Sequence, residues 1–176
     1  QLNEIDIITG NSDSPTFENT IVELERTGKT LNKVADVFFN LLSSNTNDEM
    51  DSIAADISPK LSAHRDAMSL NKKLFDRVHT VYEQRSELGL NTEQMRLVEE
   101  THKGFIRSGV QLDEPSMAEL TQINQKLSSL SVQFDQNLLK ETNEGFSLII
   151  EDEKQLDGLP QDFRDQAAKL ADANGH

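Results

Sequence analysis

The sequence contains no cysteine and no tryptophan, and it has one tyrosine beside eight phenylalanines. Without cysteine the chain can form neither disulfide bonds nor thiolate zinc sites, and it has no cysteine nucleophile. Hydrophobic residues make up 35% of the chain, which is lean for a globular protein but above the depletion that is typical of disorder. We therefore expect a folded body with an extensive polar surface.

Basic residues and long apolar runs are also scarce. Lys and Arg number 17 against 31 Asp and Glu, which gives a formal net charge of −14. This charge repels phosphate backbones and anionic lipid, so we expect no nucleic-acid partner and no membrane partner. No apolar run approaches the roughly 20 residues of a membrane span. The first residues, Gln1 to Asp6, lack the basic and apolar parts of a signal peptide.

Apolar residues recur every three or four positions along most of the chain, which is the spacing of amphipathic helices. The 176 residues are also enough for one domain with a core of its own. Because the turns between the periodic segments are short, neighbouring helices should run antiparallel. The predicted fold is mainly all-α, an antiparallel array of about six or seven helices in a single domain over residues 1–176.

Local signals predict where the first helices begin and end. Ser14 before Pro15 predicts a helix start, because serine caps a helix well and proline at the first helical position has no N–H to lose. Gly28 predicts the end of this helix near Thr27. Thr30 should then cap the next helix.

Similar signals bound the later helices. One apolar stripe continues in phase across Pro59, which predicts a single kinked helix at that point. Gly89 should end the helix that carries Leu70 to Leu88, and Asn91 or Thr92 should cap the next helix, which runs to about Ser108. A last helix is predicted from Gln161 to about Ala173.

The longest apolar stripe begins after Pro115 and predicts a helix of roughly seven turns. We interpret it as an ordinary helix that faces the core. The alternative is a coiled-coil seam that grips another chain. Its members are Met117, Leu120, Ile123, Leu127, Leu130, Phe134 and Leu138.

The period changes at Phe146-Ser147-Leu148-Ile149-Ile150, a short β-branched run after Gly145 that predicts one strand. A strand needs a hydrogen-bonding partner, and no other segment of the chain has a convincing strand pattern. The strand from Phe146 to Ile150 should therefore be unpaired here and find its partner outside this chain.

No catalytic or metal-binding motif accompanies these helices. The four histidines lack the His-Glu-x-x-His spacing that places two imidazoles and a glutamate on one helical face, so we interpret them as surface or packing residues. Adjacent carboxylates such as Glu99 and Glu100 point to different sides of a helix. We predict no catalytic, cofactor-binding or metal-binding residue in this chain. The histidines are His64, His79, His102 and His176.

A succession of short phrases nevertheless resembles the amino-terminal region of the thimet oligopeptidase and peptidyl-dipeptidase Dcp family of zinc metallopeptidases. The bacterial peptidyl-dipeptidase branch is the most similar. Each phrase is weak alone, but together they follow the family's order over nearly the whole chain. The phrases lie at residues 14–21, 57–65, 70–75, 77–78, 82, 90–98, 120–127, 134–137 and 158–160.

The resemblance implies a large helical enzyme with a deep channel, one wall of which is formed by amino-terminal helices that admit short unfolded peptides. The chain would be the non-catalytic N-terminal fragment of this enzyme and should be inactive alone. Zinc and the catalytic groups of the parent would lie beyond His176. The implied partners are the missing C-terminal catalytic part and short peptides. The implied compartment is the cytoplasm, with a periplasmic or exported location left open.

Three alternatives stay open at this point. The chain could be a stand-alone helical interaction module that uses the seam from Met117 to Leu138, or an independent enzyme of unknown chemistry. The parent could release dipeptides from carboxyl ends or cleave internally, because the residues that decide this lie elsewhere. If the fragment reading holds, the isolated chain should expose apolar surface and tend to self-associate.

Overall fold

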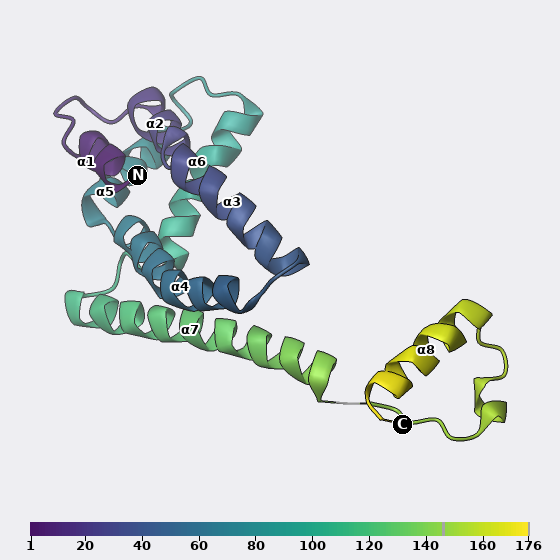
Figure 1. The fold of residues 1–176 in the computed structure, drawn as a ribbon. Coiled ribbons are helices and arrows are strands. Elements are labelled where there is room, and N and C mark those ends of the chain that lie inside the picture. The colour runs from purple at the N-terminus through teal and green to yellow at the C-terminus, as the bar shows by residue number, and fades with distance from the viewer. Residues whose placement is uncertain (146, 176) are drawn as a thin grey trace. The chain divides into compact units, whose positions relative to one another are not determined.

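The computed structural model describes residues 1–145 and 147–175, and all regular secondary structure there is helical (Figure 1). The all-α prediction is therefore confirmed. The chain divides into two compact units, Gln1–Phe134 and Asp135–His176. The elements are α1 (Leu2–Thr9), η1 (a π-helix, Phe17–Val22), α2 (Glu23–Arg26), α3 (Lys29–Ser44), α4 (Asp48–Ser69), α5 (Lys72–Gln84), α6 (Thr92–Arg107), α7 (Glu114–Glu144), η2 (a 3-10 helix, Glu153–Leu156) and α8 (Gln161–Ala173).

The core of the first unit lies where α1, η1, α5 and α6 meet. Helix α5 supplies the largest share, because its apolar residues fall on one face at helical spacing. Helix α1, which the sequence patterns did not predict, adds two buried isoleucines. The buried apolar cluster consists of Ile5, Ile8, Phe17, Ile21, Leu74, Phe75, Val78, Val81, Val98, Phe105 and Val110.

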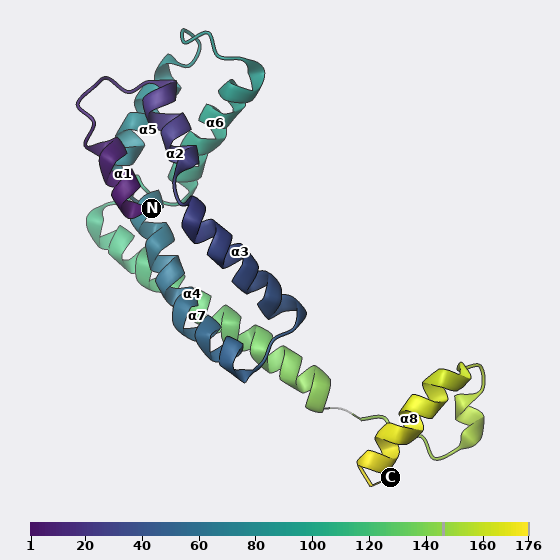
Figure 2. The same cartoon turned by 45° about the horizontal axis from the view of Figure 1, so that its top comes forward.

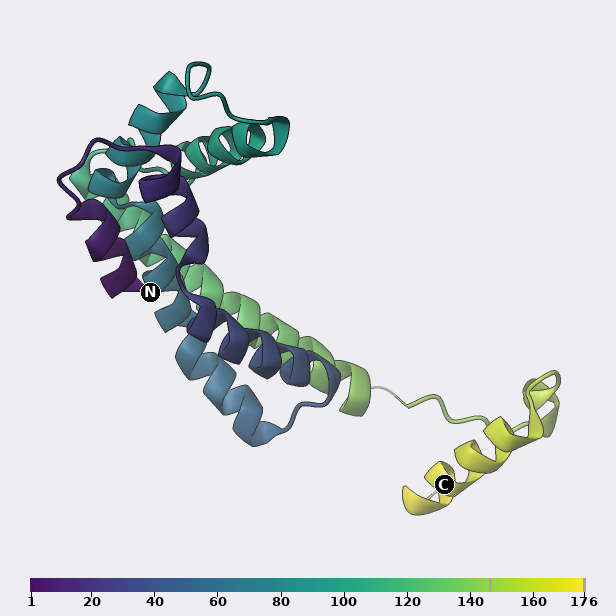
Figure 3. The ribbon, with the colours of Figure 1, turned by 90° about the horizontal axis from the view of Figure 1, so that it is seen from above.

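Helices α3 and α4 form a hairpin (Figures 2 and 3), and a hydrogen bond joins α7 to α4. The short connection after α3 ends at Asn47, whose side chain accepts a hydrogen bond from the backbone N–H of Met50 and so caps α4. Helix α4 is continuous across Pro59, which confirms the prediction of one helix there. Asn124 of α7 donates from Nδ2 to Oδ1 of Asp66 on α4 at 2.9 Å.

The first predicted helix boundary is wrong by a few residues. The cap is Thr16 rather than Ser14, and the helix begins at Phe17. Thr16 Oγ1 accepts from the backbone N–H of Asn19 at 3.1 Å, and Asn19 Oδ1 accepts from the backbone N–H of Thr16 at 2.8 Å. This reciprocal capping box satisfies two helix-end donors at once.

The turn at Gly28 was predicted correctly, but the cap after it was not. Thr27 ends α2, as expected, and Gly28 has a φ of 73°, a left-handed conformation that glycine adopts without strain. The backbone N–H of Gly28 donates to Glu4 Oε2 at 2.8 Å. Helix α3 starts directly at Lys29, so Thr30 lies inside the helix and is not its cap.

Helix α5 ends at Gln84 instead of near Gly89. Arg85 folds back, and its Nη1 donates to the carbonyl oxygen of Tyr82 at 2.7 Å, which satisfies one carbonyl of the last helical turn. The residues that follow form turns up to the start of α6. Asn91 caps α6 with a capping box to Gln94, which confirms that boundary.

Most of the apolar residues of α7 that were predicted to face the core are exposed. Its half-buried side chains include Thr121, Asn124 and Ser128, which are polar, whereas Leu127 is 60% exposed and Phe134 is 66% exposed. The interpretation as an ordinary core-facing helix is therefore wrong from Ile123 onward, whereas Met117 and Leu120 at the start of the stripe are half-buried. The hydrogen bond between Asn124 and Asp66 joins the helix to α4.

The second unit contains the end of α7, η2 and α8. Arg164 of α8 donates from Nε to the carbonyl oxygen of Leu159 at 3.1 Å and from Nη2 to that of Leu156, which ties α8 to the loop before it. Helix α8 has the predicted bounds. The predicted strand is wrong for residues 147–150, which have no regular secondary structure because no other strand is present among the described residues to pair with them. Phe146 lies outside the described residues.

Candidate functional site

A buried arginine holds the loop between α1 and η1. Arg77 of α5 is 8% exposed, and its Nη1 donates to the carbonyl oxygens of Asn11 at 2.9 Å and Asp13 at 3.2 Å. Its Nη2 donates to Asn19 Oδ1 at 3.0 Å. These three acceptors are all neutral, so the guanidinium is anchored by hydrogen bonds to one loop and one side-chain amide.

Two histidines from adjacent helices meet beside this core. His79 Nδ1 of α5 lies 3.0 Å from His102 Nε2 of α6, so one imidazole donates a hydrogen bond and the other accepts it. The ring of Tyr82 stacks on His102 with centroids 3.9 Å apart, and the Arg85 guanidinium lies 3.8 Å from the Tyr82 ring centre. Phe75 completes the stack against both imidazoles.

The environment of His102 favours the neutral imidazole. Burial lowers its pKa, because the charged form loses solvation, and the nearby His79 and Arg85 act in the same direction. Glu83 opposes them by favouring the charged form. The hydrogen-bonded pair therefore needs at least one neutral ring, and a second proton would remove the acceptor.

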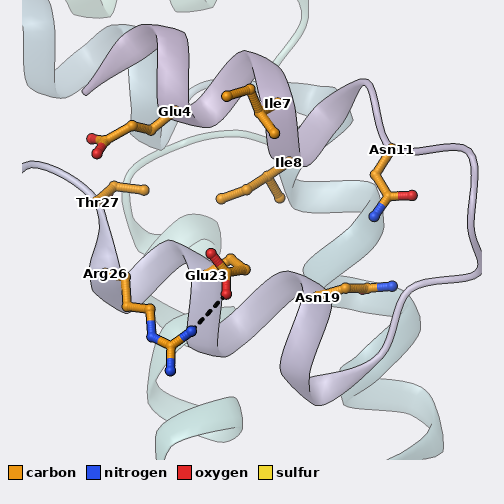
Figure 4. Close-up of a pocket in the computed structure, with 8 residues that line it drawn as sticks. All are labelled: Glu4, Ile7, Ile8, Asn11, Asn19, Glu23, Arg26 and Thr27. Atoms are coloured by element: carbon orange, nitrogen blue, oxygen red, sulfur yellow. Dashed lines mark hydrogen bonds and ion pairs between the residues drawn. The ribbon is translucent and has the colours of Figure 1, made fainter.

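A small surface pocket lies between α1 and the η1–α2 segment (Figure 4). Its volume is 190 Å³. Ile7 and Ile8 form an apolar wall on α1, and Arg26 Nη1 donates to Glu23 Oε1 at 2.8 Å on the opposite side. This arginine and this glutamate pair with each other, and the second carboxylate of the lining, that of Glu4, accepts a hydrogen bond from the backbone N–H of Gly28.

A larger groove of 620 Å³ runs between α3 and α4. Leu31, Phe39, Leu61 and Met68 give it apolar walls, and His64 lies among them. His64 Nε2 is 2.9 Å from Gln1 Oε1, so this histidine bonds to a neutral amide. The groove therefore combines apolar walls with polar and charged lining residues, among them Asp36 and Arg65.

The carboxylates singled out in the sequence do not converge. Glu100 pairs with Arg96 at 2.8 Å, whereas Glu99 lies 3.7 Å from Arg85, so these neighbours make separate contacts as predicted. Among residues 1–145 and 147–175, no three His, Asp or Glu side chains are grouped so that they could hold a metal ion. His176 lies outside the described residues.

The histidine pair is the feature that sequence reasoning missed. His79 and His102 are 23 positions apart, and neither has a motif partner on its own helix. Predicting two neighbouring antiparallel helices was possible, but the register that brings these two rings together depends on how Phe75 and Phe105 pack in the core.

In the described part of the chain, no helix is long and apolar enough to cross a membrane.

Comparison with known proteins gives the family. The chain is 37% identical over 172 residues to the dipeptidyl carboxypeptidase of Salmonella typhimurium and 36% identical over 172 residues to that of Escherichia coli, in each case over 98% of this chain. The chain fits an N-terminal region of the dipeptidyl carboxypeptidase and oligopeptidase A family. A more distant member is the oligopeptidase A of Haemophilus influenzae, 27% identical over 160 residues.

The predicted family resemblance is thus confirmed. No protein-family model matches the chain. The chain spans about a quarter of the length of the curated peptidases that it matches: 25% of each dipeptidyl carboxypeptidase and 23% of the oligopeptidase A.

Proposed function

We propose that this chain is the amino-terminal helical region of a zinc-dependent peptidyl-dipeptidase, an enzyme that releases dipeptides from the carboxyl ends of short peptides. The observation that carries the proposal is the match of 98% of the chain to two proteins named dipeptidyl carboxypeptidase. The matched region is a quarter of those proteins, and the proposal assigns the peptidase chemistry to the longer protein. A cytoplasmic location is part of the same proposal.

In this proposal the helices of residues 1–134 shape the access to a catalytic part that follows in the sequence. The family resemblance supports this role, and so does the all-helical unit with its own core. The described residues bring together no set of ligands that would suit zinc, so they do not fit the metal. The metal ligands and the group that activates water therefore belong, in the proposal, to the remaining sequence.

The experiment compares the 176-residue chain with the longer protein that contains it. Both are purified, their bound zinc is measured by elemental analysis, and both are given a short amino-blocked peptide whose products are identified by mass spectrometry. The proposal expects zinc, dipeptide release and loss of activity with a chelator in the longer protein alone.

Two other outcomes would change the conclusion. Cleavage inside the peptide, without dipeptide release, would keep the family and replace the peptidyl-dipeptidase assignment with an oligopeptidase one. A longer protein without bound zinc and without cleavage would overturn the proposal in favour of a helical interaction module. A folded protein that carries the same carboxyl-terminal residues serves as a substrate control, and it should stay uncut if the helices restrict access.

A further inference from the structure

Helix α7 exposes a continuous apolar stripe along the first unit. Ile123 is 54% exposed, Leu127 60%, Leu130 50% and Phe134 66%. With about 3.6 residues per turn, these four positions fall on one side of the helix. A stripe of this kind is normally the face that a helix buries.

The residues of α7 that pack are both apolar and polar: Met117, Leu120 and Val132 are half-buried, and so are several polar residues between them. One of these polar residues, Asn124, is hydrogen-bonded to the buried Asp66 of α4. Turning the helix to bury the leucines would break this bond and leave the buried Asp66 carboxylate without it. The hydrogen bond between Asn124 and Asp66 therefore keeps the apolar stripe on the outside.

A second copy of the chain is not expected to bind over this stripe. Each copy carries a formal net charge of −14, so pairing two copies would bring two strongly acidic bodies together. The matched peptidases, by contrast, extend well beyond the matched region, which is 25% of their length. The additional residues of such a longer protein can supply an apolar surface that covers the stripe. Because this surface belongs to the same polypeptide, its effective concentration near the stripe is high.

We propose that the stripe of Ile123, Leu127, Leu130 and Phe134 is the docking face of this region for the remaining part of the longer polypeptide. This inference rests on the proposed function, because the longer protein is known only from the relatives. It assigns α7 a specific task, which is to hold the helical unit against the catalytic part. The stripe is then an internal surface of the enzyme.

The test measures how accessible the stripe is to a thiol reagent. The chain has no cysteine, so Leu127→Cys introduces a single thiol at the centre of the stripe, and Gln122→Cys introduces one at an exposed polar position of the same helix. Each substitution is made in the 176-residue chain and in the longer protein. Labelling by a maleimide is followed at low protein concentration, and the modified peptide is identified by mass.

The proposal expects labelling at position 127 to be slower in the longer protein by about tenfold or more, because the site reacts only when the docked part opens. Labelling at position 122 should be similar in both proteins. Equal labelling of position 127 in both proteins would overturn the inference. Protection already present in the 176-residue chain would also overturn it, because the cover would then be a second copy if the protection grows with concentration, or residues 135–175 of the same chain if it does not.

A second position guards against a local disturbance, and Ile123→Cys should show the same protection as Leu127→Cys. Zinc content and peptide cleavage are measured on the same variants of the longer protein. If the longer protein binds zinc and cleaves the peptide but its thiol is not protected, the docking face is overturned and the proposed function stays intact. A protected thiol in a protein without zinc or cleavage supports the docking face and removes the peptidase assignment.

Discussion

Helices α5 and α7 carry apolar stripes of similar spacing, but the structure uses them differently. Leu74, Val78 and Val81 of α5 are fully buried against α1, η1 and α6, whereas Leu127 and Leu130 of α7 are at least half exposed. Helical spacing shows that a helix has an apolar face, and the neighbours decide whether that face is covered. The comparison separates the region around α5, which buries its own apolar face and which we call the complete region, from α7, whose stripe is exposed among the described residues.

The largest expected effect comes from the same truncation on the two helices. Leu74→Ala should lower the free energy of unfolding of the 176-residue chain by about 2–5 kcal/mol, because Leu74 is 0% exposed and its removal leaves a cavity. Leu127→Ala should change it by no more than about 0.5 kcal/mol, because that side chain is 60% exposed. Urea unfolding followed by circular dichroism measures both, and equal losses would contradict the comparison.

A substitution at Arg77 tests how far the stability of the complete region depends on the hydrogen bonds of this one arginine. Arg77→Met keeps a long apolar stem but removes the donors to Asn11, Asp13 and Asn19, and it should cost about 2–3 kcal/mol because these acceptors lose a charged partner. Arg107→Met, at an exposed position of α6, is the matched control and should be nearly neutral. Faster proteolysis of the loop before η1 in the Arg77 variant alone would locate the effect.

A substitution at Asn124 tests the hydrogen bond that joins α7 to α4. Asn124→Ala should cost about 1–2 kcal/mol, because Asp66 Oδ1 then stays buried without its hydrogen-bond donor. Gln122→Ala, on the exposed side of the same helix, should be close to neutral. Hydrogen exchange of the α7 amides gives the local readout, and unchanged protection in the Asn124 variant would show that another contact holds this helix in place.

The smallest expected effect is a pH dependence in the complete region. Since the pKa of His102 is lower in the folded chain than in the unfolded one, the unfolded chain binds more protons as the pH falls through the ordinary histidine range. The free energy of unfolding should therefore decrease between about pH 7.5 and about pH 5.5. His102→Phe, which keeps a ring against Tyr82, should flatten this dependence. An unchanged slope in the His102 variant would assign the titration to other groups.

Local signals predicted the helices well where one residue decides the outcome. Asn91 capped its helix and Gly28 marked its turn, because capping and positive φ depend on the residue itself. Helix α1 escaped prediction since its eight residues are too few to establish a period. The exposure of Ile123 to Phe134 on α7 escaped prediction because helical spacing does not say whether a neighbour covers the apolar face.

The candidate site was less predictable than the helices. The absence of a His-Glu-x-x-His segment could be read directly from the sequence. The contact between His79 and His102 could not, because it joins two helices whose relative register is set by core packing.

The way in which Arg77 is bonded has a consequence for how this family can vary. Two of its three acceptors are backbone carbonyl oxygens, those of Asn11 and Asp13, which every amino acid possesses. Substitutions at Asp13 should therefore be tolerated among related peptidases, provided that the loop keeps its length, whereas Asn11 also uses its side chain, whose Oδ1 accepts from the backbone N–H of Asp13 at 2.8 Å. The third acceptor is the side chain of Asn19, which also caps the following helix. Arg77 and Asn19 should accordingly be retained or lost together, while Asp13 in the loop that they hold is free to diverge.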